Sequence, residues 1–165
     1  MRIVGPALDE RAQCEEVLRS LPQWFGIEAA LLEYAREAEA RQNFVARSNG
    51  GVVGFVTMHV HNAATLELGC IAIVPAFHGY GVGTRLCATV EAWWAARGGR
   101  LIQVKTLGPT KASAAYARTR QFYAARGFLP VEEFANLWPG NPCLLLVKPL
   151  PTNAAAYAQT VSIPT

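Results

Sequence analysis

A glycine-rich turn, His78-Gly79-Tyr80-Gly81-Val82-Gly83-Thr84, constrains this chain more than any other segment. It follows an apolar run that ends at Pro75 and precedes a run with apolar residues at helical spacing, so it joins a strand to a helix. Because glycines carry no Cβ, successive backbone N–H groups can converge on an anion there, helped by the positive end of the helix. The turn therefore predicts a binding site for a phosphorylated ligand.

Two common phosphate motifs do not fit this turn. A GxGxxG dinucleotide fingerprint that began at Gly79 would need glycine at Thr84, and one that began at Gly81 would need glycine at Leu86. A P-loop needs Gly-Lys followed by Ser or Thr, and no glycine in the chain precedes a lysine. The turn alone leaves the ligand open.

Hydrophobic periodicity predicts alternating strands and helices along the chain. Asn49-Gly50-Gly51 lies between two apolar runs and predicts a hairpin with a type I′ turn, because both central residues must adopt positive φ. The pattern predicts an α/β fold, a mixed sheet with helices on its faces. The predicted strands are 2–6, 42–48, 52–61, 65–74, 100–107, 128–134 and 143–149, and the predicted helices are 9–20, 24–41, 83–97 and 112–126.

Length and composition narrow the class of protein. The 165 residues are 52% hydrophobic and 16% charged, which predicts one globular domain over residues 1–150. Residues 151–165 form a tail rich in Pro, Ala and Thr. No apolar run reaches the roughly 18 residues of a membrane span, and no signal peptide opens the chain, so we expect a cytoplasmic protein without a membrane partner. The four isolated cysteines indicate small, reduced, buried residues.

Charge is divided unevenly along the chain. Residues 1–41 hold eight acids against five arginines, whereas the net charge of the whole chain is +3. A net charge of this size does not indicate a nucleic-acid partner. The division favours an acidic N-terminal part that meets a cationic ligand and a cationic remainder that meets an anionic one. The alternative is that the acids are solvated helix faces.

Two segments resemble the GNAT superfamily of N-acetyltransferases. Residues 66–86, LELGCIAIVPAFHGYGVGTRL, look like its acetyl-CoA-binding segment, with His78, Gly81 and Gly83 at the three marked positions. Residues 120–134, RQFYAARGFLPVEEF, resemble its second signature, a helix ending in Tyr, three residues and Gly-Phe. The resemblance runs in element order from residue 2 to 150. It implies a mostly antiparallel sheet of about seven strands, splayed at the cofactor site and flanked by about four helices.

The resemblance implies acetyl-CoA as cosubstrate. Its pantetheine arm would pair with a strand edge, and its pyrophosphate would lie on the N–H groups of the glycine turn. Three residues depart from the family pattern: His78 replaces Gln or Arg, Tyr80 replaces a frequent Arg or Lys that would supply a phosphate cation, and Tyr116 replaces an Asn that contacts the cofactor. The implied cofactor-binding residues are Ile71, Ala72, Ile73, His78, Gly79, Tyr80, Gly81, Val82, Gly83, Thr84 and Tyr116.

The resemblance also implies two catalytic residues. Glu67 lies where one branch of the family places its general base; we expect partial burial beside Gly69 to raise its pKa, and the base to act directly or through water. Alternation along the strand would put Glu67, Gly69 and Ile71 on one face. Tyr123 lies where the family keeps the general acid for the leaving thiolate. The alternatives are a glutamate that only pairs with an arginine and a buried structural tyrosine.

Other residues are candidates for the acceptor pocket. Trp24, Phe25 and Trp138, in the N-terminal helices and a late loop, are expected either to line this pocket or to pack in the core. His59 shares a strand face with His61, and without a third ligand at suitable spacing we expect a pocket or surface position and no metal.

We therefore expect an acetyl-CoA-dependent N-acetyltransferase that acts on a primary amine in a ternary complex. The acidic N-terminal part favours a small cationic amine. The alternatives are a protein N-terminal or lysine acetyltransferase and a non-catalytic acyl-CoA-binding module. By analogy with the family, a homodimer is expected.

Overall fold

A computed structural model describes residues 1–8 and 10–151 of the chain, so all of the predicted tail except Pro151 lies outside the described residues. The described part contains one seven-stranded sheet in the order β1-β2-β3-β4-β5-β7-β6, in which only β4 and β5 pair in parallel. This confirms the mixed, mostly antiparallel sheet. The strands are β1 Arg2–Ala7, β2 Gln42–Ser48, β3 Gly51–Val60, β4 Thr65–Ile73, β5 Leu101–Leu107, β6 Leu129–Trp138 and β7 Asn141–Pro149.

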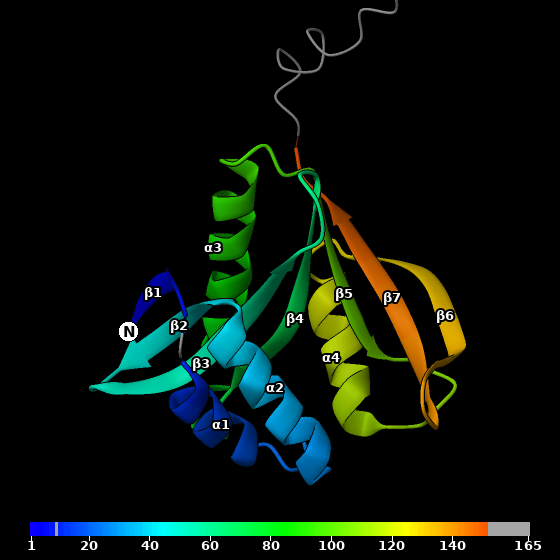
Figure 1. The fold of residues 1–165 in the computed structure, drawn as a ribbon. Helices are drawn as coiled ribbons and strands as arrows, with labels where there is room; N and C mark the ends of the chain where they lie inside the picture. Colours follow the sequence, from blue (N-terminus) through cyan, green and yellow to red (C-terminus); the bar gives the residue numbers. More distant parts are fainter. Residues whose placement is uncertain (9, 152–165) are drawn as a thin grey trace, which may run out of the picture.

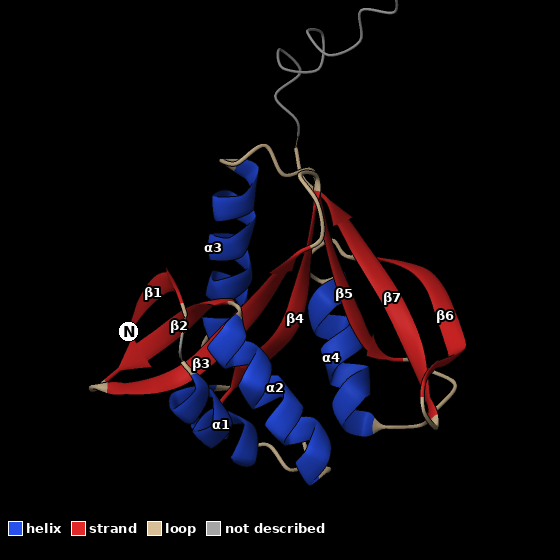
Figure 2. Cartoon of the chain, in the orientation of Figure 1, coloured by secondary structure: helices blue, strands red, loops and turns tan. Residues whose placement is uncertain are grey.

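Helices cover both faces of the sheet (Figures 1 and 2). On β2, Val45 packs in a cluster with α1 and α2, whereas its neighbours Phe44 and Ala46 pack in a second cluster with α3 and α4. This alternation gives the fold two cores, one on each side of the sheet. The helices are α1 Arg11–Arg19, α2 Glu28–Ala40, α3 Val82–Ala95 and α4 Ala114–Ala124, with a short 3₁₀ turn at Pro75–Phe77.

Within the described ranges, no helix has both the length and the apolar character that a membrane crossing requires.

The sheet splits between β4 and β5. Their parallel pairing runs only from Thr65 opposite Leu101 to Leu68 opposite Val104, and β4 then continues to Ile73 without a partner on that side. Figure 1 shows the two strands starting together and diverging, with α4 beside the gap. The backbone groups along this part of β4 form a free edge that a ligand can reach.

A β-bulge precedes the free edge. Opposite β3, Met58 pairs with Leu68 and Thr57 pairs with Cys70, so Gly69 is an extra residue. An extra residue reverses the alternation of side chains beyond it. Cys70 accordingly packs with α1 and α2, and Ile71 packs on the opposite side. The expectation that Ile71 shares a face with Glu67 is therefore wrong.

The local turn predictions fare unevenly. Asn49 and Gly50 both have positive φ, at 49° and 83°, which confirms the type I′ hairpin. The predicted helix 24–41 begins only at Glu28, because residues 20–27, with Pro22 and Gly26, form a loop that carries Trp24 and Phe25. The predicted loop around Trp138 is the tight end of a hairpin, since β6 reaches Trp138 and β7 starts at Asn141.

A buried polar side chain ties α2 to the sheet. Asn43 is fully buried and its amide donates to the carbonyl oxygens of Ala38 and Arg41, at 2.7 Å each. Its own oxygen accepts the Thr57 hydroxyl at 2.7 Å. These bonds satisfy carbonyls at the end of α2 that have no partner within the helix.

We predict that Asn43→Ala lowers the free energy of unfolding by about 2–4 kcal/mol, because it leaves buried carbonyl groups without donors. Urea unfolding measures this change. The exposed neighbour Gln42 is a control, and Gln42→Ala should change stability by no more than about 0.5 kcal/mol. A loss below about 1 kcal/mol for Asn43→Ala would contradict the assigned role.

Candidate active site

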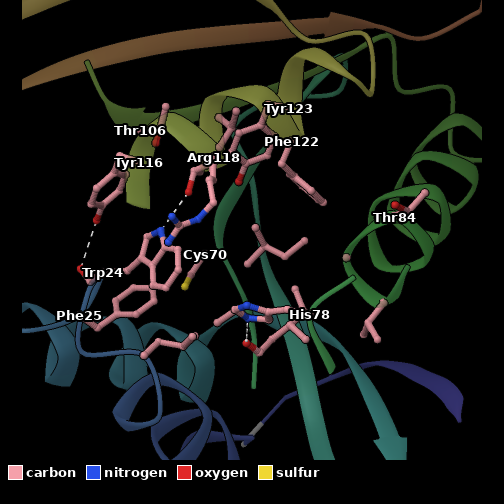
Figure 3. A pocket seen from close by; sticks show the side chains of 18 of the residues that line it. Trp24, Phe25, Cys70, His78, Thr84, Thr106, Tyr116, Arg118, Phe122 and Tyr123 are labelled. Carbon is pink, nitrogen blue, oxygen red and sulfur yellow. Dashed lines mark hydrogen bonds between the residues drawn. The ribbon is translucent and has the colours of Figure 1, made fainter. Parts of the chain in front are cut away.

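The gap between β4 and β5 contains a cavity of about 500 Å³, which we call the main cavity. The free part of β4, the diverging part of β5, the glycine turn, α4 and the loop 20–27 all contribute to its walls (Figure 3). Most of the predicted cofactor-binding residues lie together on this cavity: Ile71, Ala72, Ile73, His78, Gly79, Gly81, Val82, Gly83, Thr84 and Tyr116.

The glycine turn has the geometry of an anion cradle. Gly79 and Gly81 have positive φ, at 80° and 74°, a conformation that side chains rarely allow. Gly83 is required for another reason, since a Cβ there would lie 2.9 Å from Cε2 of Phe122. The N–H groups of the first turn of α3 have no intrahelical partners, and they belong to residues that line the main cavity.

His78 lines the main cavity, whereas the side chain of Tyr80 lies in solvent. The ring of His78 donates from Nε2 to the carbonyl oxygen of Ile73 at 2.7 Å, which fastens the turn to the end of β4. Tyr80 is 76% exposed and does not line the main cavity. The structure therefore does not bring the Tyr80 side chain to the predicted cofactor site.

The loop between α1 and α2 reaches across the cavity to α4. The indole N–H of Trp24 donates to the hydroxyl of Thr119 at 3.0 Å, and the Tyr116 hydroxyl donates to the Trp24 carbonyl at 3.2 Å (Figure 3). The guanidinium of Arg118 lies 5.5 Å from the Trp24 ring centroid. Phe25 and Trp138 also line this cavity, so the three aromatic residues predicted for the acceptor pocket lie around one space.

Tyr123 extends from α4 to the main cavity and is only 3% exposed. Its ring packs edge-on against Phe122 and Phe128. Burial raises the pKa of Tyr123 well above its ordinary value, so the hydroxyl keeps its proton at neutral pH. The Tyr123 side chain therefore packs in the core and borders the main cavity.

A second cavity of about 430 Å³ adjoins the first, and we call it the side cavity. Both cavities are lined by Tyr34, Gly69, Lys105 and Trp138, so they meet where β4 and β5 part. Glu67 and His59 line the side cavity only. The two predicted catalytic residues therefore lie on adjoining cavities, Tyr123 on the main one and Glu67 on the side one.

Glu67 is held by three donors at one of its oxygens. Oε2 accepts hydrogen bonds from Lys105 Nζ and Gln103 Nε2 and contacts His61 Nε2, each at 2.7 Å. Oε1 has no hydrogen-bond partner among residues 1–8 and 10–151. The carboxylate is therefore fixed at one oxygen and free at the other.

The expected rise in the pKa of Glu67 is wrong. Burial acts to raise this pKa, but the hydrogen bonds from Lys105, Gln103 and His61 outweigh burial and hold it below the ordinary value. Glu67 is an ionised carboxylate at neutral pH. The expected alternative, a plain ion pair, is partly present, with a lysine in place of an arginine.

Most acids of the N-terminal part form ion pairs with arginines. Arg19 bridges Glu15 and Glu28, and Arg11 binds Glu39. Of the acids in α1 and α2, Glu33 and Glu37 line the side cavity, together with Arg41 from the end of α2. The charge division is real in the sequence, but few of these acids lie at the candidate site.

The rings of His59 and His61 lie against each other at a tilt of 43°, with centroids 4.2 Å apart. Burial, followed by the charges of Arg41 and His61, lowers the pKa of His59. Within the described part of the chain, no three His, Cys, Asp or Glu side chains are grouped to hold a metal ion.

Sequence reasoning missed two cations at the site. Lys105 lies at the junction of the two cavities, and Arg126 lines the main cavity and donates to the hydroxyl of Thr84 in the first turn of α3. Arg118 and Arg120, which stand on α4, donate to Gln23 in the loop 20–27 and to the Leu107 carbonyl. The only local signal for Arg126 was its position before Gly127, four residues after Phe122.

Comparisons with known proteins agree with this geometry. The family model described as "Acetyltransferase (GNAT) domain" matches residues 39–130, more than half of the chain. No curated protein sequence matches significantly.

Several solved structures share the fold. A putative GNAT-family acetyltransferase from Desulfovibrio desulfuricans is 20% identical with a TM-score of 0.73, over 90% of this chain and 99% of that one. An aminoglycoside 6′-N-acetyltransferase complexed with coenzyme A is 21% identical with a TM-score of 0.69, over 92% and 99%. The ribosomal-protein-S18-alanine N-acetyltransferase from Escherichia coli is 17% identical with a TM-score of 0.73, over 92% and 94%.

We predict that the Glu67 network stabilises the protein only while Glu67 is ionised. Because the folded-state pKa is below the ordinary value of 4.5, the stabilisation is fully present above about pH 4.5 and is lost as pH falls through the folded pKa. Glu67→Gln should therefore cost about 1–3 kcal/mol at pH 7, and this cost should shrink below pH 4.5.

Urea unfolding of both proteins between pH 3 and pH 7 measures this difference. Glu16→Gln, at an exposed glutamate without an ion pair among the described residues, separates the loss of one carboxylate from the loss of the network. A cost for Glu67→Gln that stays constant down to pH 3 would rule out the ionised network.

Proposed function

The chain belongs to the GNAT acetyltransferase family, and we propose that it transfers the acetyl group of acetyl-CoA to a primary amine by direct attack in a ternary complex. The observation that carries the proposal is the junction at Gly69. There a cavity bounded by a phosphate cradle meets a cavity bounded by a fixed carboxylate. One opening serves an anionic cosubstrate and the other serves an acceptor.

The residues present fit acetyl-CoA. The N–H groups from Gly79 to Thr84 suit the pyrophosphate, and the unpaired edge of β4 at Ile71–Ile73 suits an amide-bearing arm that pairs like a strand. The apolar walls at Ile73 and Phe122 suit the methylene groups of that arm. Acetyl-CoA supplies an acetyl group that is activated as a thioester.

Tyr123 is proposed as the group that stabilises the leaving sulfur. Its hydroxyl is protonated at neutral pH and lies on the main cavity, in the helix that faces the free edge of β4. A donor at the sulfur lowers the barrier to breakage of the carbon–sulfur bond, by proton transfer or by a hydrogen bond to the developing charge. Its buried position keeps water away from the donor.

Glu67 is proposed to receive the proton of the amine, directly or through one water molecule. Oε1 faces no competing donor in the described structure, whereas Oε2 is held by Lys105. A carboxylate with a lowered pKa is a weak base but a permanent anion, so it attracts the ammonium form of the acceptor as well. We therefore expect its contribution to be at the low end of general-base catalysis.

The acceptor is proposed to be a small cationic amine held in the side cavity. The lining there includes three carboxylates, on Glu33, Glu37 and Glu67, against the cations of Arg41 and Lys105. Glu37 and Glu67 pair with these two cations, and Glu33 pairs with Arg36, which does not line the cavity. Tyr34 and Trp138 provide aromatic faces on which an ammonium or an aliphatic amine can pack. The fold resemblance to both aminoglycoside and ribosomal-protein acetyltransferases makes a peptide amine the alternative to test.

We predict that Tyr123→Phe lowers kcat by about 10²-fold with little change in the KM for acetyl-CoA, because only the hydroxyl is lost. Thiol release from acetyl-CoA over a panel of polyamines, amino sugars and short peptides measures turnover. Unchanged kcat on the best acceptor would remove Tyr123 from the mechanism.

We predict that Glu67→Gln lowers kcat/KM for the amine by about 10²-fold, since the charge and the proton acceptor are both lost. Glu91→Gln is a matched control, because Glu91 also binds a lysine, Lys148, at 2.6 Å but lines neither cavity. The control should keep wild-type rates.

The panel also separates the rival functions. Turnover confined to peptides would replace the small-amine acceptor with a protein N-terminus or lysine. Binding of acetyl-CoA without turnover on any amine would favour the non-catalytic module, and absence of binding would contradict both.

A further inference from the structure

We propose that Arg126 is a phosphate-binding residue that contacts the pyrophosphate of the acyl-CoA at the glycine turn. This inference rests on the proposed function, because it assumes a CoA ligand in the main cavity. It assigns a role to a residue outside the glycine turn and supplies a cation that the turn itself lacks.

The position of Arg126 follows from the contacts of Phe122 with Gly83 and with Arg126 itself. Gly83 in the first turn of α3 leaves room for the ring of Phe122, which a Cβ would meet at 2.9 Å. The guanidinium of Arg126 lies over the Phe122 ring, with its carbon 3.6 Å from the ring centroid. These contacts place the guanidinium of Arg126, which follows α4 in the chain, beside the start of α3.

Hydrogen bonds fix the guanidinium beside the cradle. One terminal nitrogen donates to the Phe122 carbonyl at 2.5 Å, and the other donates to the hydroxyl of Thr84. Thr84 lies in the first turn of α3, where the free N–H groups face the main cavity. Arg126 and these N–H groups therefore border the same space.

The charge of Arg126 has no counter-ion among the described residues. No carboxylate in residues 1–8 and 10–151 forms an ion pair with it, and its buried Nε lacks a hydrogen-bond partner in the described structure. A half-buried guanidinium without an anion is unfavourable unless a ligand supplies one. A phosphate group supplies two oxygens that match the guanidinium fork.

The sequence of the glycine turn explains why a cationic side chain from another part of the chain is needed at the phosphate. The glycine turn from His78 to Thr84 contains no lysine or arginine, and Tyr80 is turned to solvent. Of the described arginines, Arg118 also lines the main cavity, but it is engaged with Trp24 and Gln23 in the loop 20–27. Arg126 is the one placed at the cradle.

Binding of three ligands tests the assignment. CoA and 3′-dephospho-CoA both carry the pyrophosphate, and their binding is measured by calorimetric titration. Pantetheine carries no phosphate, and its binding is measured by ligand-observed NMR. Arg126→Met keeps an apolar stem over Phe122, and Arg126→Lys keeps the charge. Arg97→Met is a matched control. The guanidinium carbon of Arg97 lies 4.1 Å from the ring centroid of Trp93, four residues earlier, and Arg97 donates to the Trp93 carbonyl at 3.0 Å. Arg97 lines neither cavity.

We expect Arg126→Met to weaken CoA and 3′-dephospho-CoA alike, by about 10- to 100-fold, with pantetheine unaffected. Arg126→Lys should lose less, and Arg97→Met should bind as the wild type does. A loss for CoA alone would move the contact to the 3′-phosphate and overturn the assignment.

An equal loss for pantetheine would show a purely structural role and would also overturn the assignment. Failure of the wild-type protein to bind CoA would instead refute the proposed function, so the two failures are distinguishable.

Discussion

The parting of β4 and β5 is the constraint on which the rest of the structure depends. Parallel strands normally pair along their length, but here the pairing stops after Leu68 and Val104. The bulge at Gly69 follows at once and changes which side chains face each core. Had the two strands stayed paired, neither the main cavity nor its junction with the side cavity would exist.

Stopping the pairing leaves backbone groups that need partners. Unpaired N–H and C=O groups inside a fold are costly, and native proteins satisfy almost all of them. The structure meets this demand in part with its own residues, since His78 binds the carbonyl of Ile73. It covers the remaining opening with α4 and with the loop that carries Trp24, which leaves a shaped cavity in place of an exposed strand edge.

Electrostatics at the two cavities follow from contacts between elements rather than from total charge. Lys105 on β5 lies against Glu67 on β4 and, together with Gln103 and His61, reverses the effect of burial on the carboxylate pKa. Arg126 at the end of α4 reaches the first turn of α3. Each cation comes from a different strand or helix than its partner, and the spacing of neither pair along the chain signals the contact.

The sequence by itself determined the order of strands and helices, two tight turns and the family. Asn49-Gly50 forms the predicted turn because only a few residues tolerate positive φ at both positions, and Gly79 and Gly81 adopt positive φ in the glycine turn for the same reason. Tertiary structure alone decided the reversed alternation after Gly69, the low pKa of Glu67 and the position of Arg126. Turns depend on the conformational limits of a few adjacent residues, whereas register, pKa and ion contacts depend on neighbours that folding brings from distant parts of the chain.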